Sequence, residues 1–164
     1  MRKRPLIRGF LGLLILGAGH LPVFAGDSVY GTVIAVRSAE VVTFDYGAGR
    51  YEVRIAGIDL SALSAADAKQ AEQIVTRLVL RKNARIRLPR RAKTGTLVAQ
   101  LLTDDPVDGI KDVAIELLYL GLAKSQPGSD SRFGYKYGEL KAAEARAKTA
   151  QPPRGVWARD QVPR

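Results

Sequence analysis

Short segments in which apolar and polar residues alternate recur along the chain, and this pattern predicts β-strands with one face turned toward a core. Three of them come early, and a glycine-rich turn at residues 47–49 joins the second to the third as a hairpin. A fourth and a fifth follow after a longer gap. The five predicted strands cover residues 30–36, 41–44, 51–58, 84–88 and 97–102.

Between the third and fourth strands, apolar residues recur at helical spacing instead. Ala71, Val75 and Leu78 share one face of this predicted helix. Ser64 suits the N-terminal cap, because Asp67 follows three residues later in the manner of a capping box. The pattern therefore predicts a helix that begins just after Ser64.

Two more helices are predicted toward the C-terminus. The first covers residues 113–120 and ends at Gly121, which suits the left-handed conformation that terminates many helices. The second covers residues 137–149 and ends before Pro152 and Pro153. Three strands, a helix, two strands and two helices follow the order of an OB-fold barrel. The expected fold class is therefore α+β, a five-stranded OB-fold barrel with three helices.

The N-terminal residues differ from the rest and predict a secretory signal peptide. Basic residues at positions 2, 3, 4 and 8 precede an apolar run at 10–19, and residues 23–25 suit cleavage. The run is shorter than the roughly 20 residues that a membrane span needs. We therefore expect residues 1–25 to be removed and the protein to be exported, to the periplasm or outside the cell, with an uncleaved N-terminal anchor as the alternative. Residues 26–158 are predicted to form one domain, followed by a tail at 159–164.

Removal of the first 25 residues changes the charge and the available chemistry. The segment holds four of the 26 basic residues and none of the 16 acidic ones, so the remainder carries a net charge of +6. It also holds His20, the one histidine, and the chain has no cysteine. Zinc sites with the usual ligands, disulfides, thiol nucleophiles and histidine acid–base catalysis are therefore excluded from the predicted mature chain. Any metal must be a hard cation bound by oxygen.

The third predicted strand and the turn after it contain the most informative charges. The sequence YEVRIAGIDLSA places Arg54 within the strand and Asp59 beyond Gly57, and no acidic residue occurs at positions 60–62. An arginine can grip phosphate oxygens through two parallel hydrogen bonds, and a carboxylate can hold a metal ion. A structural role is the alternative, in which Arg54 and Asp59 pair with each other or with Glu40.

Six segments, in order, resemble the staphylococcal nuclease (thermonuclease) domain family. They are GTVIAV at 31–36, VRIAGID at 53–59, the helix starting near Ala65, TGTLVAQLL at 94–102, LLYLGLA at 117–123 and AEARAKTAQPPRGVWA at 143–158. The resemblance implies an OB-fold phosphodiesterase that cleaves DNA and RNA with one calcium ion. Within such a fold we expect Trp157 to be a core aromatic residue that caps the barrel.

The resemblance assigns roles to four positions. Glu40 falls where the family has an aspartate calcium ligand, and its side chain is one methylene longer. Arg54 matches an arginine that contacts the phosphate, and Asp59 matches a second calcium ligand. Leu60 replaces a threonine whose backbone carbonyl also binds the metal, and a backbone contact survives a change of side chain. These residues imply a weak Ca²⁺ site at most.

Other positions of the family's catalytic set hold different residues. Ser61 and Ala62 replace a proline and the glutamate proposed to activate water, and Thr96 replaces an arginine that stabilises charge on the phosphate. The family's base-stacking tyrosines have no clear counterpart, although Tyr135 and Tyr137 are near the expected place. Acid–base help is worth about 10²–10⁴ in rate, and a transition-state arginine about 10³–10⁵. The resemblance therefore implies a degenerate catalytic set.

We therefore expect a domain that binds nucleic acid or another polyanion and is impaired as an enzyme. Sequence-independent binding depends on contacts between basic residues and phosphates. Five basic residues lie in and just after the fourth strand: Arg85, Arg87, Arg90, Arg91 and Lys93. Two alternatives remain open, an active calcium-dependent DNA/RNA endonuclease with a rearranged site and an envelope scaffold that binds proteins.

Overall fold

The structure, a computed structural model, describes residues 28–87, 97–105, 109–127, 135 and 138–159. The predicted signal peptide and residues 160–164 of the predicted tail lie outside these ranges. Within them, no helix is both long and apolar enough to cross a membrane.

Five strands form a closed ring. Neighbouring strands pair in the order β3-β2-β1-β5-β6, and β3 pairs again with β6, in parallel, which closes the ring. The strands are β1 (Ser28–Val36), β2 (Val41–Asp45), β3 (Arg50–Ile55), β5 (Asn83–Arg87) and β6 (Leu97–Asp105). The predicted α+β class and its five-stranded barrel are thereby confirmed.

Three short strands add to this ring. β7 (Gly109–Asp112) forms a hairpin with β6, and β4 (Ile58–Asp59) pairs with β8 (Lys124–Ser125) in a separate two-stranded sheet. The predicted third strand, 51–58, is therefore two strands. Gly57 separates them because its φ of +90° departs from the extended conformation of a strand.

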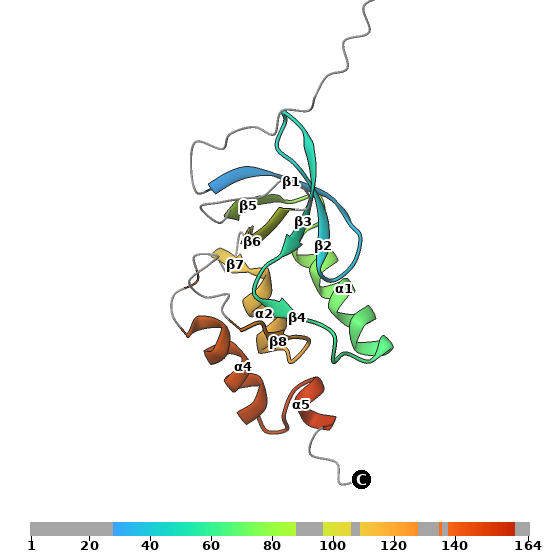
Figure 1. The fold of residues 1–164 in the computed structure, drawn as a ribbon, viewed down its shortest axis with the longest axis vertical. Helices are drawn as coiled ribbons and strands as arrows, with labels where there is room; N and C mark the ends of the chain where they lie inside the picture. Colours follow the sequence, from blue (N-terminus) through green and yellow to red (C-terminus); the bar gives the residue numbers. More distant parts are fainter. Residues whose placement is uncertain (1–27, 88–96, 106–108, 128–134, 136–137, 160–164) are drawn as a thin grey trace, which may run out of the picture.

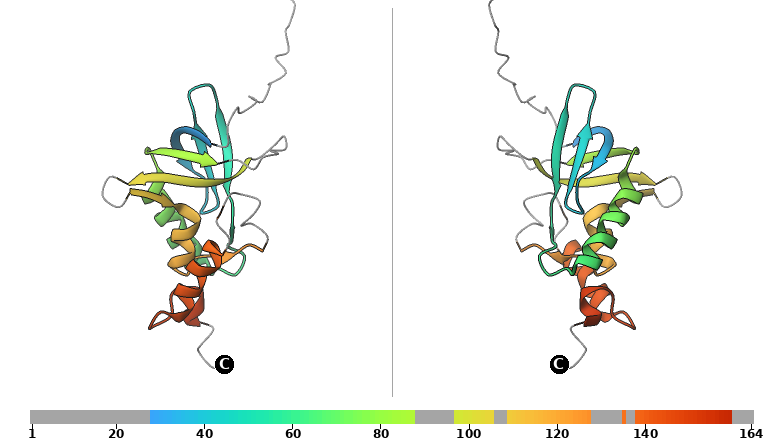
Figure 2. Two further views of the ribbon diagram at one scale, coloured as in Figure 1. Left: turned by 90° about the vertical axis from the view of Figure 1, so that its left-hand side faces the viewer. Right: turned by 90° about the vertical axis from the view of Figure 1, so that its right-hand side faces the viewer.

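The helices lie mainly beyond one end of the barrel, as Figure 1 and the two side views of Figure 2 show. They are α1 (Ala65–Val79), α2 (Val113–Tyr119), α4 (Glu139–Thr149) and α5 (Val156–Arg159). Ser64 caps α1 as predicted, since its Oγ accepts a hydrogen bond of 3.2 Å from the Asp67 N–H. The α5 helix was not predicted.

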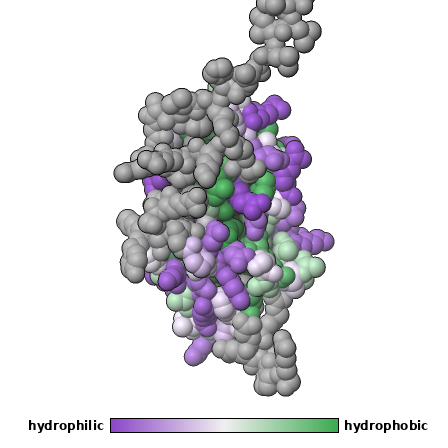
Figure 3. All heavy atoms as spheres, viewed as in Figure 1, coloured by the Kyte–Doolittle hydropathy of each residue, from purple (hydrophilic) through white to green (hydrophobic). Residues whose placement is uncertain are grey.

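The core fills the barrel and continues under α1. Phe44, Val53, Ile86 and Leu101 are at most 1% exposed and come from four different strands of the ring. The buried face of α1 consists of Ala71, Val75 and Val79. Hydrophilic residues dominate the described surface in the view of Figure 3, which also shows a hydrophobic strip near its centre.

Candidate functional site

The first part of the site lies where β2 meets β3. Arg54 pairs with Val41 across the two strands, and the Ile55 N–H donates a hydrogen bond of 2.8 Å to the Glu40 carbonyl. Glu40 is therefore held beside Arg54, and its Oε2 lies 4.0 Å from Arg54 Nη1. The Arg54 side chain is 57% exposed, so this is a loose surface ion pair worth at most about 1 kcal/mol.

Asp59 lies in β4, directly opposite Lys124 of β8. Its Oδ1 accepts a hydrogen bond of 2.9 Å from the Ser61 N–H. This backbone bond, the Ser61 hydroxyl and the nearby Lys124 charge hold the pKa of Asp59 below its usual value. The carboxylate is therefore ionised at neutral pH, but it already has partners in its own turn. Glu40, Arg54 and Asp59, which the family resemblance assigns to one site, are called the Arg54 cluster below.

The described residues do not fit a calcium site. Ca²⁺ takes six to eight oxygen ligands, usually including several carboxylates. The predicted ligands are Glu40, Asp59 and the Leu60 carbonyl, and within the described ranges no three acidic side chains come together. Glu40 faces Arg54, and Asp59 accepts from Ser61. No catalytic step through a metal follows from this arrangement.

Neither Ala62 nor the polar residues described after it supply the missing catalytic chemistry. Ala62 is exposed but has no ionisable group. Ser64 Oγ donates a hydrogen bond of 2.7 Å to Asp67 Oδ2, so both side chains belong to the helix cap. Thr96 lies outside the described residues, as does Tyr137. Tyr135 is buried, and its hydroxyl donates to the Ala56 carbonyl at 3.0 Å, which makes it a structural residue.

A sequence profile of the family described as "Staphylococcal nuclease homologue" matches residues 52–159, which is more than half of the chain. The chain belongs to this family. A search of the curated proteins found no match. The family comprises nucleases and nucleic-acid-binding domains, and the matched range includes Arg54 and Asp59. Glu40 and the whole of β1 and β2 precede it.

Within this nuclease-homologue domain, Trp157 is not a core residue of the barrel, and that expectation is wrong. It is half-buried in α5, and its ring lies against α4 and β8. Lys148 Nζ lies 4.0 Å and Lys124 Nζ 4.9 Å from the ring centroid, which is the geometry of cation–π contacts. Trp157 therefore links α5 to α4 and to β8, the strand that pairs with β4. The sequence carries no signal for this long-range contact.

Two of the five basic residues predicted to bind nucleic acid can be placed on the domain. Arg85 and Arg87 are half-buried residues of β5 and lie on the same face of the strand. Arg85 pairs with Tyr30 of β1, which no motif had indicated as a functional residue. Arg90, Arg91 and Lys93 lie outside the described residues.

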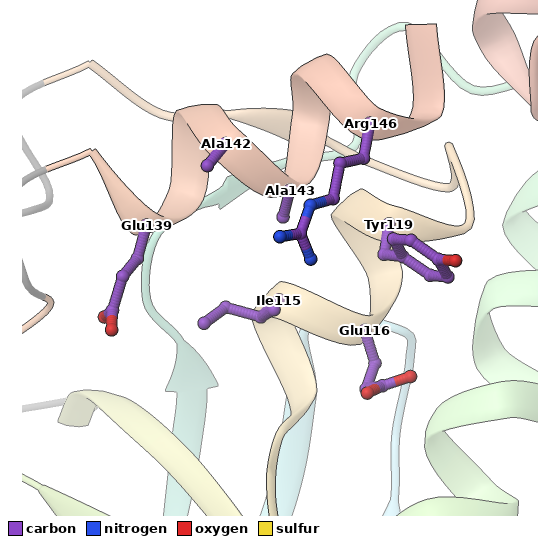
Figure 4. Close-up of a pocket in the computed structure, with 7 residues that line it drawn as sticks. All are labelled: Ile115, Glu116, Tyr119, Glu139, Ala142, Ala143 and Arg146. Carbon is purple, nitrogen blue, oxygen red and sulfur yellow. The ribbon is translucent and has the colours of Figure 1, made fainter. Parts of the chain in front are cut away.

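A groove of about 370 Å³ lies between α2 and α4. Figure 4 shows Arg146 extending from α4 toward α2, with the carboxylates of Glu116 and Glu139 at the edges. Two carboxylates and one guanidinium make this groove unfavourable for a polyanion.

Proposed function

We propose that the domain binds nucleic acid, or another polyanion, and has lost most of the phosphodiesterase capacity of its family. One observation carries this proposal. Among the described residues, Arg54 and Asp59 are kept from the catalytic set, but no group of three acidic side chains comes together to hold a calcium ion. A calcium ion takes six to eight oxygen ligands, usually with several carboxylates, so the metal-dependent chemistry of the family is not supported there.

The chemistry of the missing groups supports the same proposal. Position 62 holds alanine, so the site lacks the residue to which the family resemblance assigns the activation of water, a contribution worth about 10²–10⁴ in rate. Binding makes weaker demands, because contacts between basic side chains and phosphates are sufficient. The net charge of +6 beyond residue 25 and the arginines of β5 meet that demand. Export to the periplasm or the exterior is part of the proposal and rests on the N-terminal sequence.

A calcium-dependent phosphodiesterase is the second candidate. It is favoured by the exposure of Arg54 and by the lowered pKa of Asp59, because a metal ligand must be ionised. Both properties are also compatible with the surface interactions described above.

Binding and cleavage can be measured on the same samples. The purified protein is mixed with a labelled single-stranded oligonucleotide, with calcium or with a chelator, over a range of salt concentrations. We expect binding whose logarithm falls linearly with the logarithm of the salt concentration, and an intact oligonucleotide throughout.

Cleavage that the chelator abolishes, and that Asp59→Asn abolishes but Glu72→Gln does not, would overturn the proposed impairment. Glu72 is an exposed carboxylate of α1 and serves as the matched control. Absence of binding at low salt would overturn the proposed function itself.

A further inference from the structure

Tyr30 is the most exposed large hydrophobic residue of the part that the structure describes. It is 67% exposed, compared with 36–60% for Ile34, Ile110 and Tyr119. It lies near the start of β1, where it pairs with Arg85 of β5, so its backbone is held in the sheet. A single exposed apolar residue needs no explanation. The ring of Tyr30, however, contacts Arg85. Along the strand it also has a hollow on one side and a second arginine on the other, which together suit a nucleotide.

Arg85 fixes the ring of Tyr30. The two residues are direct partners in the pairing of β1 with β5. Arg85 Nη1 donates a hydrogen bond of 3.3 Å to the Tyr30 hydroxyl, and its guanidinium carbon lies 5.7 Å from the ring centroid. A ring that is already ordered loses less conformational entropy when a ligand stacks on it.

In one direction along the two strands, the ring borders a hollow that contains both apolar surface and polar side chains. The hollow has a volume of about 390 Å³ and is lined by Tyr30, Gly31, Thr32, Asn83, Ala84 and Asp104. The hydroxyl of Thr32, the amide of Asn83 and the carboxylate of Asp104 offer hydrogen-bond donors and acceptors. A flat ring with polar edges, such as a nucleobase, matches this combination, whereas the negative charge of Asp104 disfavours a phosphate there.

In the other direction, the same face is cationic. Arg87 follows Arg85 by two residues, so the two side chains are about 7 Å apart along β5 and on one side of it. Arg87 is paired with Ser28, the residue two positions before Tyr30. Among the described residues, no carboxylate forms an ion pair with either arginine. Both guanidinium groups can therefore contact phosphates.

We propose that this surface binds single-stranded nucleic acid, with one base stacked on Tyr30 at the hollow and the adjoining phosphates on Arg85 and Arg87. We call it the Tyr30 face. Stacking on an exposed aromatic residue beside cationic side chains is a general means of binding single strands. The proposal rests on the proposed function and specifies its ligand and place, on strands away from the Arg54 cluster.

The test separates bases from phosphates. Affinities of the purified protein for a labelled oligo(dT) and for an abasic strand of equal length are measured by fluorescence anisotropy. We expect tighter binding of oligo(dT). Tyr30→Ala should weaken oligo(dT) binding by about 5- to 150-fold and leave the abasic strand unaffected, because stacking is worth about 1–3 kcal/mol per base. Tyr30→Phe keeps the ring and should retain the preference.

Each other outcome has a defined meaning. If the wild type binds oligo(dT) and Tyr30→Ala binds it equally well, the Tyr30 face is wrong while the proposed function stands. Equal losses on both strands, or displacement of oligo(dT) by an uncharged oligosaccharide, would also overturn base stacking. If the wild type binds neither strand, the proposed function fails as well. Circular dichroism should show that both variants fold, because the Tyr30 side chain is exposed.

Discussion

The Arg54 cluster and the Tyr30 face are built on the same barrel, but their charges are used differently. In the Arg54 cluster each charged group has a partner within the protein, as Arg54 has Glu40 and Asp59 has Ser61. On the Tyr30 face, Arg85 interacts with a neutral tyrosine, and its positive charge is not neutralised. A ligand at the Arg54 cluster must therefore compete with these internal contacts, whereas a phosphate on Arg85 displaces no carboxylate.

Two turns on either side of β3 differ in how closely their backbones are packed. The turn before Asp59 contains Gly57, where an added Cβ would lie 3.0 Å from Leu140 Cδ1 and 3.1 Å from Tyr135 Cε2. The turn between β2 and β3 contains Gly47, with nearly the same φ, +89°, and open space around it. The turn before Asp59 is therefore a closely packed framework, whereas the turn between β2 and β3 is open.

The largest expected effect tests that framework. Gly57→Ala should destabilise the domain by about 2–5 kcal/mol, from unfavourable positive φ and from overpacking against α4. Gly47→Ala should cost only the conformational term, about 1–2 kcal/mol. Urea unfolding of both variants measures the difference. Equal effects would show that the turn before Asp59 is not packed as described.

A second prediction concerns Asp112, the last residue of the edge strand β7. Asp112 caps α2 and accepts a hydrogen bond of 2.6 Å from Gln100. Burial raises the pKa of Asp112 to about 6, and Glu139 adds to this effect. Because the folded state binds this proton more tightly, the contribution to stability is present below about pH 4 and is lost as the pH rises through 6. It amounts to at most about 3 kcal/mol.

Asp112→Asn removes this titration while an asparagine can still cap the helix. The decline in the free energy of unfolding between pH 4 and 7 should therefore be smaller in the variant than in the wild type. Parallel pH profiles would contradict the raised pKa.

The third prediction compares the arginines of the two regions directly. Arg85→Gln with Arg87→Gln should reduce the salt dependence of oligonucleotide binding by about 1.4 in the log–log slope, or about 0.7 for each lost phosphate contact. Arg54→Gln should leave the slope unchanged, because Arg54 is in β3 and the proposed ligand lies on β1 and β5. Anisotropy titrations over a range of salt concentrations provide both slopes. The reverse result would place the ligand on the Arg54 cluster.

The smallest effect should come from releasing Arg54. Glu40→Gln removes the carboxylate beside Arg54 and makes the domain more positive by one charge, so oligonucleotide binding at low salt should tighten slightly. The double variant Glu40→Gln, Arg54→Gln is the control and should lose this gain. If the single variant binds no more tightly at low salt, the Glu40–Arg54 pair does not limit binding.

Much of the fold could be predicted from local pattern. The strands at 30–36 and 41–44, the Ser64 cap and the helix before Gly121 follow from alternation and capping, which act over a few residues. β7 was missed because glycine is typical of the turn that ends a strand. Here Gly109 is instead the first residue of β7, which forms a hairpin with β6. α5 was missed because four residues are too few for a helical period.

The site was less accessible to sequence reasoning. The family resemblance assigned Glu40 and Arg54 to the same site. The structure agrees, with 4.0 Å between Glu40 Oε2 and Arg54 Nη1. The sequence left open whether Arg54 pairs with Glu40 or binds a ligand. It also could not show that Lys124 lies opposite Asp59, because strand pairing joins residues far apart in the chain. Tyr30 could have been noticed as an aromatic residue on the outward side of the first strand, but its arginine partner is 55 residues away.

The parallel contact between β3 and β6 also determines when the domain can acquire its form. It joins residues 53–55 to residues 97–99, so the ring cannot close until both segments have been synthesised and brought together. Such long-range pairing is slow compared with helix formation. A chain that stopped before Leu97 would leave β3 and β5 with unpaired edges, which invite association with other chains. Truncations within β6 should therefore accumulate as aggregates rather than as a smaller soluble domain.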